Sequence, residues 1–198
     1  MKQKAFMNQQ SHTSDWLKKY YFLRSGVSIA WILLAIVIGQ RTPLVAAVLL
    51  VLYPVWDAIA NFLDARKNGG FRSNFSQGFN AAISLIAAAC IAYGLGIGMK
   101  PVLIIFGAWA ILSGAFQLIT GIRRWKSYGA QWVMVLSGGQ SILVAGHFFT
   151  KAGALPTPGI EVVIPYACLG AFYFLLSAVW LTVKNARNRP VRTAYHTK

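Results

Sequence analysis

Six long apolar runs, separated by short polar or Gly- and Pro-rich connections, dominate the chain. They cover residues 23–38, 43–63, 77–95, 101–122, 131–149 and 162–183. A helix needs roughly 20 mostly apolar residues to cross the hydrocarbon core of a bilayer, and each run is close to that length. Barrel strands would instead appear as roughly ten-residue segments of alternating polarity, which this sequence lacks. The pattern therefore predicts an all-α membrane protein with six transmembrane helices.

The basic residues divide unequally between the two sides of this predicted topology. Of the 19 Lys and Arg residues, all except Arg41, Lys100 and Lys151 fall on one side. Because cytoplasmic loops retain an excess of Lys and Arg, both termini are expected in the cytoplasm. The predicted organisation is a cytoplasmic N-terminal segment (1–22), a transmembrane domain (23–183) and a basic cytoplasmic tail (184–198).

The composition argues against a soluble protein, because 57% of the residues are hydrophobic and only 12% are charged. The formal net charge of +15 is compatible with nucleic-acid binding. However, the basic residues form short clusters between apolar runs, which is typical of membrane anchors. The expected partner is therefore the lipid bilayer, and no nucleic acid is expected.

Recognisable catalytic and cofactor-binding motifs are missing from the sequence. It has no phosphate-binding GxxxxGK[ST] loop, no HExxH and no His/Cys/Asp/Glu cluster with metal-ligand spacing. Cys90 and Cys168 each lie inside an apolar run, where a thiol behaves as a small hydrophobic group. We therefore expect a non-enzymatic protein without a metal or cofactor.

Similar segments recur along the chain and suggest internal repeats. The fourth run carries FGAWAILSGAFQL from Phe106, and the sixth carries LGAFYFLLSAVWL from Leu169. The second run, LYPVWDAIANFLDARK, ends in basic residues, as does FGAWAILSGAFQLITGIRRWK. These segments predict three tandem helical hairpin repeats over residues 23–63, 77–122 and 131–183.

The repeated segments resemble those of the HdeD family of bacterial acid-resistance membrane proteins. The resemblance covers most of residues 23–183, and its most telling stretch is FGAWAILSGAFQLITGIRRWK. It implies a six-helix protein of the bacterial inner membrane, linked to acid stress in one well-known member. It implies no catalytic or binding residues.

A series of small residues and one amide runs along a single face of the fourth predicted helix. We call this series, at steps of three and four, the glycine seam; it comprises Gly107, Ala110, Gly114, Gln117 and Gly121. Small residues let helix backbones approach closely in a membrane. The seam is therefore interpreted as packing between helices of one chain, and the alternative is a homo-oligomer interface or a pore lining.

Asp57 is the one acidic residue well inside a predicted span, where a charged side chain is costly and often functional. Asn61 and Asp64 follow at four and seven residues, so all three lie on one helical face. This face is a candidate proton-accepting or ion-guiding site. Alternatively, Asp57 reaches water at the interface or is neutralised by a basic side chain such as Arg66 or Lys67.

His147 and Glu161 are candidates for pH sensing because both belong to the predicted outer side of the last hairpin. Unperturbed histidine titrates near pH 6.5 and glutamate near 4.3, so acid exposure would change both charges. The alternative interpretation is two interfacial polar residues without a sensing role.

The sequence leaves three functions open. The first is an HdeD-type membrane component that contributes to acid tolerance by an unknown mechanism. The second is a small transporter or channel for protons, ions or a small solute. The third is an assembly or chaperone-like partner of another membrane protein, and a homo-oligomer is possible in each case.

Overall fold

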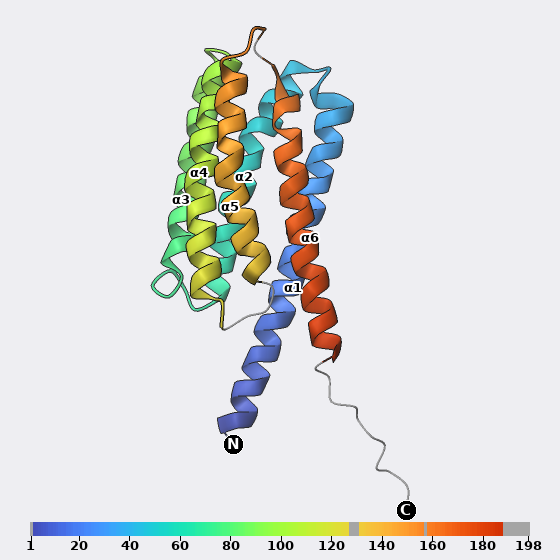
Figure 1. Cartoon of the computed structure of the whole chain (residues 1–198), viewed down its shortest axis with the longest axis vertical. Helices are drawn as coiled ribbons and strands as arrows, with labels where there is room; N and C mark the ends of the chain where they lie inside the picture. Colours follow the sequence, from blue (N-terminus) through green and yellow to red (C-terminus); the bar gives the residue numbers. More distant parts are fainter. Residues whose placement is uncertain (1, 127–130, 157, 188–198) are drawn as a thin grey trace, which may run out of the picture.

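The computed structural model describes residues 2–126, 131–156 and 158–187, and this part of the chain is almost entirely helical (Figure 1). Its long helices are α1 (Lys2–Leu34), α2 (Pro43–Lys67), α3 (Phe75–Leu95), α4 (Met99–Arg123), α5 (Gln131–Ala152) and α6 (Ile164–Arg187). A π-helical segment, η1 (Ala35–Gly39), continues α1, and a 3-10 turn, η2 (Ile160–Val162), precedes α6. All six long helices run lengthwise in one bundle.

The prediction of six apolar helices in an all-α fold is confirmed. Within the described residues, six segments are long and apolar enough to cross a membrane, namely 15–39, 43–67, 75–95, 99–123, 131–152 and 160–187. Large apolar side chains are exposed on every helix, as at Leu33, Leu52, Leu85 and Leu143. Such a surface suits lipid better than water, because soluble proteins rarely expose apolar patches of this extent.

The helix that contains the first span begins well before the predicted start of that span at residue 23, because α1 is continuous from Lys2. Leu17, Tyr20 and Tyr21 lie on one face of α1 and are buried. They belong to a core cluster that also contains Ala178 and Leu181 of α6. Apolar side chains spaced by three and four residues thus give α1 a buried face on the N-terminal side of the apolar run.

The helices form two groups. One is the pair of α1 and α6, which pack along each other; in the other, α2 packs on α3, α3 on α4 and α4 on α5. Figure 1 shows α1 and α6 on one side of the bundle. The contact between α5 and α6 is less extensive, and α1 meets α2 mainly through side chains, such as Trp31, whose indole N–H donates to the Leu49 carbonyl oxygen at 2.8 Å. Of the predicted hairpins, the α3–α4 pair therefore packs closely. The backbone of α1, in contrast, packs mainly along α6 and not along α2.

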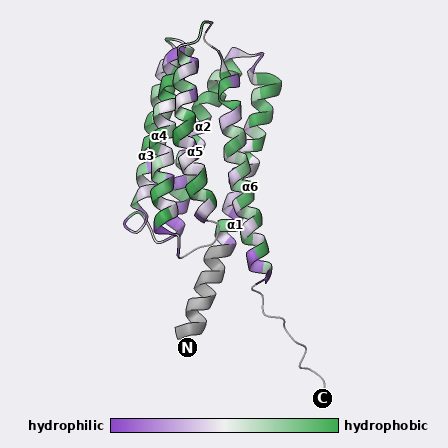
Figure 2. Cartoon of the chain, viewed as in Figure 1, coloured by the Kyte–Doolittle hydropathy of each residue, from purple (hydrophilic) through white to green (hydrophobic). Residues whose placement is uncertain are grey.

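Basic residues gather at one end of the bundle. There α2 ends in Arg66 and Lys67, α4 ends in Arg123, and α6 ends in Lys184 and Arg187. We call this the basic end. The opposite end holds Arg41, Lys100 and Lys151. Figure 2 shows green, apolar residues along much of the helices and purple, hydrophilic residues near their ends.

Candidate functional site

Asp57, near the middle of α2, is buried and forms an ion pair with Arg24 of α1. The Arg24 guanidinium also donates a hydrogen bond to the Tyr20 hydroxyl at 3.1 Å. Its central carbon lies 4.1 Å from the centre of the Phe174 ring on α6, a cation–π contact. The pair thus joins the α1–α6 group to the α2–α5 group.

Both oxygens of the Asp57 carboxylate have partners. One accepts from Arg24, and the other accepts from Asn61 Nδ2 at 3.0 Å and from Ser84 Oγ at 2.9 Å. Ser84 in turn accepts from the Trp109 indole N–H at 2.9 Å. Because charge and hydrogen bonds are matched, the buried carboxylate is well accommodated as an anion.

The suggestion that Arg66 or Lys67 neutralises Asp57 is wrong. Arg66 is exposed, and Lys67 lies over the Trp16 ring at 5.6 Å. With a rise of about 1.5 Å per residue, both lie roughly 14 Å or more further along α2. The charge that reaches Asp57 therefore comes from another helix.

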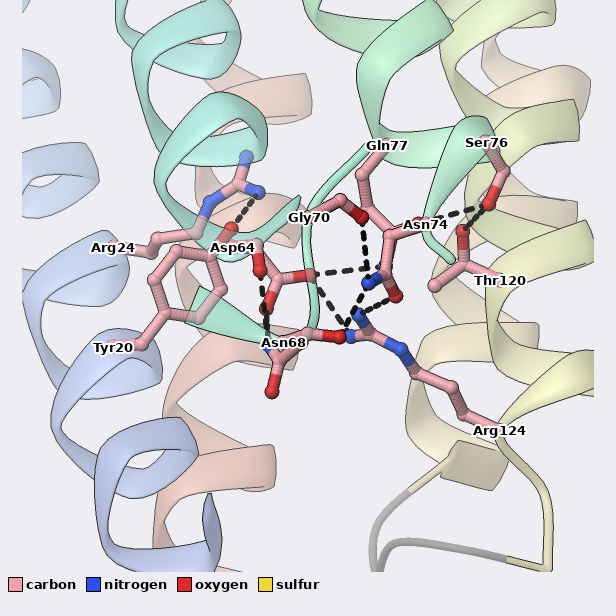
Figure 3. Close-up of polar contacts among 10 residues, drawn as sticks. All are labelled: Tyr20, Arg24, Asp64, Asn68, Gly70, Asn74, Ser76, Gln77, Thr120 and Arg124. Atoms are coloured by element: carbon pink, nitrogen blue, oxygen red, sulfur yellow. Dashed lines mark hydrogen bonds and ion pairs between the residues drawn. The ribbon is translucent and has the colours of Figure 1, made fainter. Parts of the chain in front are cut away.

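Asp64 belongs to a second polar group, shown in Figure 3, and not to the surroundings of Asp57. Asp64 accepts from Arg124 Nη1 at 2.9 Å, from Gln77 Nε2 at 3.1 Å and from Asn68 Nδ2 at 2.5 Å. Arg124 also donates to Asn74 Oδ1 at 2.7 Å. We call Asp64, Asn68, Asn74, Gln77 and Arg124 the Asp64 cluster.

Hydrogen bonds of the Asp64 cluster link the turn between α2 and α3 to the end of α4. Asn74 Nδ2 donates to the carbonyl oxygens of Asn68 and Gly70, at 2.5 and 3.2 Å. Gly69 and Gly70 have φ values of 101° and 81°, a region that favours glycine. These bonds satisfy backbone groups that the turn leaves without helical partners. The cluster is thus a structural element at the basic end.

A cavity of about 50 Å³ lies between the two helix groups, beside Asp57. Side chains from α1, α2, α4, α5 and α6 line it, all of them within the apolar spans. Two hydrogen-bonded pairs form part of its wall. Tyr173 donates to Gln140 Oε1, and the hydroxyls of Ser141 and Tyr166 lie 2.7 Å apart.

Several other polar groups on the cavity wall have no hydrogen-bond partner among the described residues. Ser28 and Ser113 are only 5% and 6% exposed, and neither hydroxyl is bonded to the protein. The part-exposed side chains of Tyr53 and Gln117 also line the cavity without a hydrogen bond to a described residue. The Trp56 indole N–H is buried without an acceptor. Polar groups this deep in a protein normally find partners, so the wall is suited to a bound polar molecule.

The glycine seam of α4 faces α5. A Cβ atom at Gly114 would lie 2.6 Å from the carbonyl oxygen of Gly138, and one at Gly107 would lie 2.5 Å from the Phe149 ring. At Gly121 it would come within 3.0 Å of Val135. The structure thus places most of the seam in a close contact within the chain. Ala110 is buried in the core, and Gln117 lines the cavity.

His147 and Glu161 do not meet. His147 is exposed on α5 with its ring 6.2 Å from that of Phe148, and Glu161 is exposed in η2. The Glu161 carboxylate accepts from the Gly159 N–H at 2.7 Å. No contact joins His147 to Glu161 in the described part of the chain.

The described residues include no group of three or more His, Cys, Asp or Glu side chains able to hold a metal ion. Cys90 and Cys168 are free and exposed on α3 and α6. The cavity wall offers hydroxyls, amides, aromatic rings and the Asp57 carboxylate, which is paired with Arg24.

Sequence reasoning missed two important side chains, Arg24 and Arg124. Both were counted only among the basic residues that set topology. One signal was available for Arg24, which lies just inside the first apolar run, while Asp57 lies inside the second. Opposite charges in two apolar runs indicate a possible pair, because ionisable groups in membranes usually pair with each other. Comparisons with protein-family models, with curated proteins and with solved structures find no match for this chain.

Proposed function

We propose that this chain is a non-enzymatic, multi-pass membrane protein that moves a small polar solute through the space between its two helix groups. The observation that carries this proposal is the cavity, which holds unpartnered polar side chains inside otherwise apolar spans. Polar groups in a membrane interior are costly to keep and commonly mark a solute path. Binding sites in helical bundles also favour such interior positions.

The packing of the helices supports movement at this cavity. The cavity lies where α1 and α6 meet the α2–α5 group, and the helix contacts there are less extensive than those inside each group. Alternating access in many transporters is a rocking of one helix group against another around a central site. The buried Arg24–Asp57 pair spans this junction and would hold the groups together in the closed arrangement.

The surroundings of Asp57 favour solute movement over a proton or ion path. Its carboxylate is matched by Arg24, Asn61 and Ser84, so it presents no free charge to the cavity. A permeating ion would lose its hydration without meeting an opposite charge there.

Flux through purified protein in proteoliposomes tests this function. Vesicles should be challenged with gradients of neutral solutes, alkali cations, chloride and protons, with protein-free vesicles as the reference. Faster passage of a neutral polar solute than in protein-free vesicles supports the proposed function, whereas faster passage of ions or protons alone would contradict it. Rates equal to those of protein-free vesicles for the whole panel would contradict it.

We further propose a bacterial inner-membrane location with the basic end in the cytoplasm. The support is the excess of Lys and Arg at that end.

The HdeD resemblance, the three tandem repeats and a contribution to acid tolerance are also proposals. Survival of a deletion strain in acid tests the last of these. If His147 and Glu161 sense pH, replacing both with Gln should remove any acid-dependent phenotype.

A further inference from the structure

We infer that the cavity binds a small neutral polyol, held by the side chains of Ser28, Tyr53, Ser113 and Gln117. This inference rests on the proposed function in taking the cavity as the solute site. Four polar side chains from α1, α2 and α4 face one space and have no hydrogen-bond partner in the described residues. They define a site that the Arg24–Asp57 pair borders.

The size of the cavity limits the solute. A water molecule needs roughly 10–15 Å³ of such space, so a cavity of about 50 Å³ holds roughly four waters. Four waters occupy roughly 120 Å³ of liquid, at about 30 Å³ each, and a three-carbon polyol such as glycerol displaces about as much. A six-carbon polyol is too large for the cavity in this arrangement.

The hydrogen-bonding groups match a molecule with several hydroxyls. Ser28, Tyr53 and Ser113 each offer a hydroxyl that can donate and accept, and the Gln117 amide offers both functions at separate atoms. Ser113 and Gln117 are four residues apart on α4 and therefore lie on the same face of that helix. Ser28 and Tyr53 approach from α1 and α2. A polyol, whose hydroxyls also donate and accept, can satisfy these groups together.

The rest of the wall favours a neutral molecule with a carbon skeleton. Asp57 carries the one carboxylate on the wall, and Arg24 compensates its charge. Rings of Tyr53, Trp109 and Tyr166 provide apolar surface for C–H groups. Binding sites for small molecules commonly combine aromatic walls with a few placed polar groups. An anion or cation would meet no opposite free charge and would lose its hydration.

Saturation-transfer difference NMR on the full chain in nanodiscs tests this binding without requiring transport. The probes are glycerol and erythritol, with mannitol as the oversized polyol and choline and acetate as charged solutes. We expect transfer signals from glycerol and erythritol, and signals at the level of empty nanodiscs from the other three. Equal or stronger signals from choline or acetate would overturn the inference.

Substitutions separate the site from non-specific binding. The double variant Ser28→Ala/Ser113→Ala should lower the affinity for glycerol roughly tenfold, since it removes two buried hydrogen-bonding groups. Ser177→Ala is the matched control, because Ser177 is also a buried serine but does not line the cavity. Equal glycerol binding by wild type and the double variant would overturn the inference.

The binding experiment tests the polyol site and the flux experiment tests transport, so either result can be negative without the other. Glycerol binding without flux of any solute would contradict transport and leave the site standing. Flux of another neutral solute without polyol binding would support the proposed function and overturn the polyol site, and flux of ions alone would contradict both.

Discussion

Arg24 and Asp57 form a largely buried ion pair between α1 and α2, two helices whose other contacts include the Trp31 indole N–H, which donates to the Leu49 carbonyl oxygen at 2.8 Å. The two residues are 33 positions apart in the chain. The pair lies at the junction of the α1–α6 group with the α2–α5 group and next to the central cavity. It is therefore both a structural link between the groups and part of the wall of the proposed site.

Breaking this pair should strongly destabilise the protein. Asp57→Asn leaves Arg24 as a buried, uncompensated charge, and removal of one partner from such a pair typically costs about 3–5 kcal/mol. Arg24→Gln should have a similar effect for the reverse reason. Thermal or SDS-induced unfolding in detergent measures the loss. The double variant Arg24→Gln/Asp57→Asn should be more stable than either single variant, because no charge remains buried. A double variant whose loss equals the sum of both single losses would contradict the pairing.

Arg124 and its neighbour Arg123 should respond very differently to substitution. Arg124→Ala removes donors to Asp64 and Asn74, whereas Arg123 is exposed and makes one 3.4 Å contact to the Ser73 carbonyl oxygen. We expect Arg124→Ala to cost about 3 kcal/mol and Arg123→Ala about 0.5 kcal/mol or less. Hydrogen exchange should also rise over residues 68–76 in the first variant only. Equal effects would show that the Asp64 cluster does not fasten this turn.

Gly114→Ala should loosen the contact between α4 and α5. The new Cβ would lie 2.6 Å from the carbonyl oxygen of Gly138, so a backbone must move, and we expect a cost of about 1–3 kcal/mol. Gly139→Ala is the control, because no atom lies within 4 Å of its Cβ. The two open interpretations of the glycine seam differ here. Intrachain packing predicts lower stability with an unchanged oligomeric state, whereas a homo-oligomer interface predicts a changed mass by light scattering.

The proposed orientation predicts which positions an impermeant thiol reagent reaches in intact cells. With Cys90 and Cys168 replaced by Ala, a cysteine introduced by Lys151→Cys should react from outside. One introduced by Arg72→Cys should react only after permeabilisation, because Arg72 lies at the basic end between α2 and α3. The reverse pattern would refute a cytoplasmic basic end.

The spans were predictable because hydrophobic length is a local property of the sequence. The predicted run 43–63 corresponds to α2, which continues to Lys67, and the run 101–122 corresponds to α4, from Met99 to Arg123. The differences are at the helix ends, where polar residues extend a helix beyond its apolar part. The glycine seam was likewise visible, because its period follows the helical repeat.

The pairing of helices was not predictable from these patterns. Periodicity shows which face of a helix is small or polar, but it does not show which helix covers that face. The contact of α1 with α6 depends on residues far apart in sequence, such as Ser25, which donates to the Ala171 carbonyl oxygen at 3.1 Å. The cavity is the space left once all helices have packed, so no single segment encodes it.

Glycerol entry into proteoliposomes, followed by light scattering in a stopped-flow instrument, tests the central claim most directly when Gly170→Val is compared with wild type. Gly170 lines the cavity, and a Cβ there would make an ordinary 3.5 Å contact with the Tyr53 hydroxyl. The Gly170→Val variant should therefore fold, with the valine side chain filling part of the cavity. Gly139→Val, on the open side of α5, is the matched control. We predict faster swelling than in protein-free vesicles for wild type and Gly139→Val, and swelling at the protein-free rate for Gly170→Val. A wild-type rate equal to that of protein-free vesicles, or an unchanged rate in Gly170→Val, would contradict passage through this cavity.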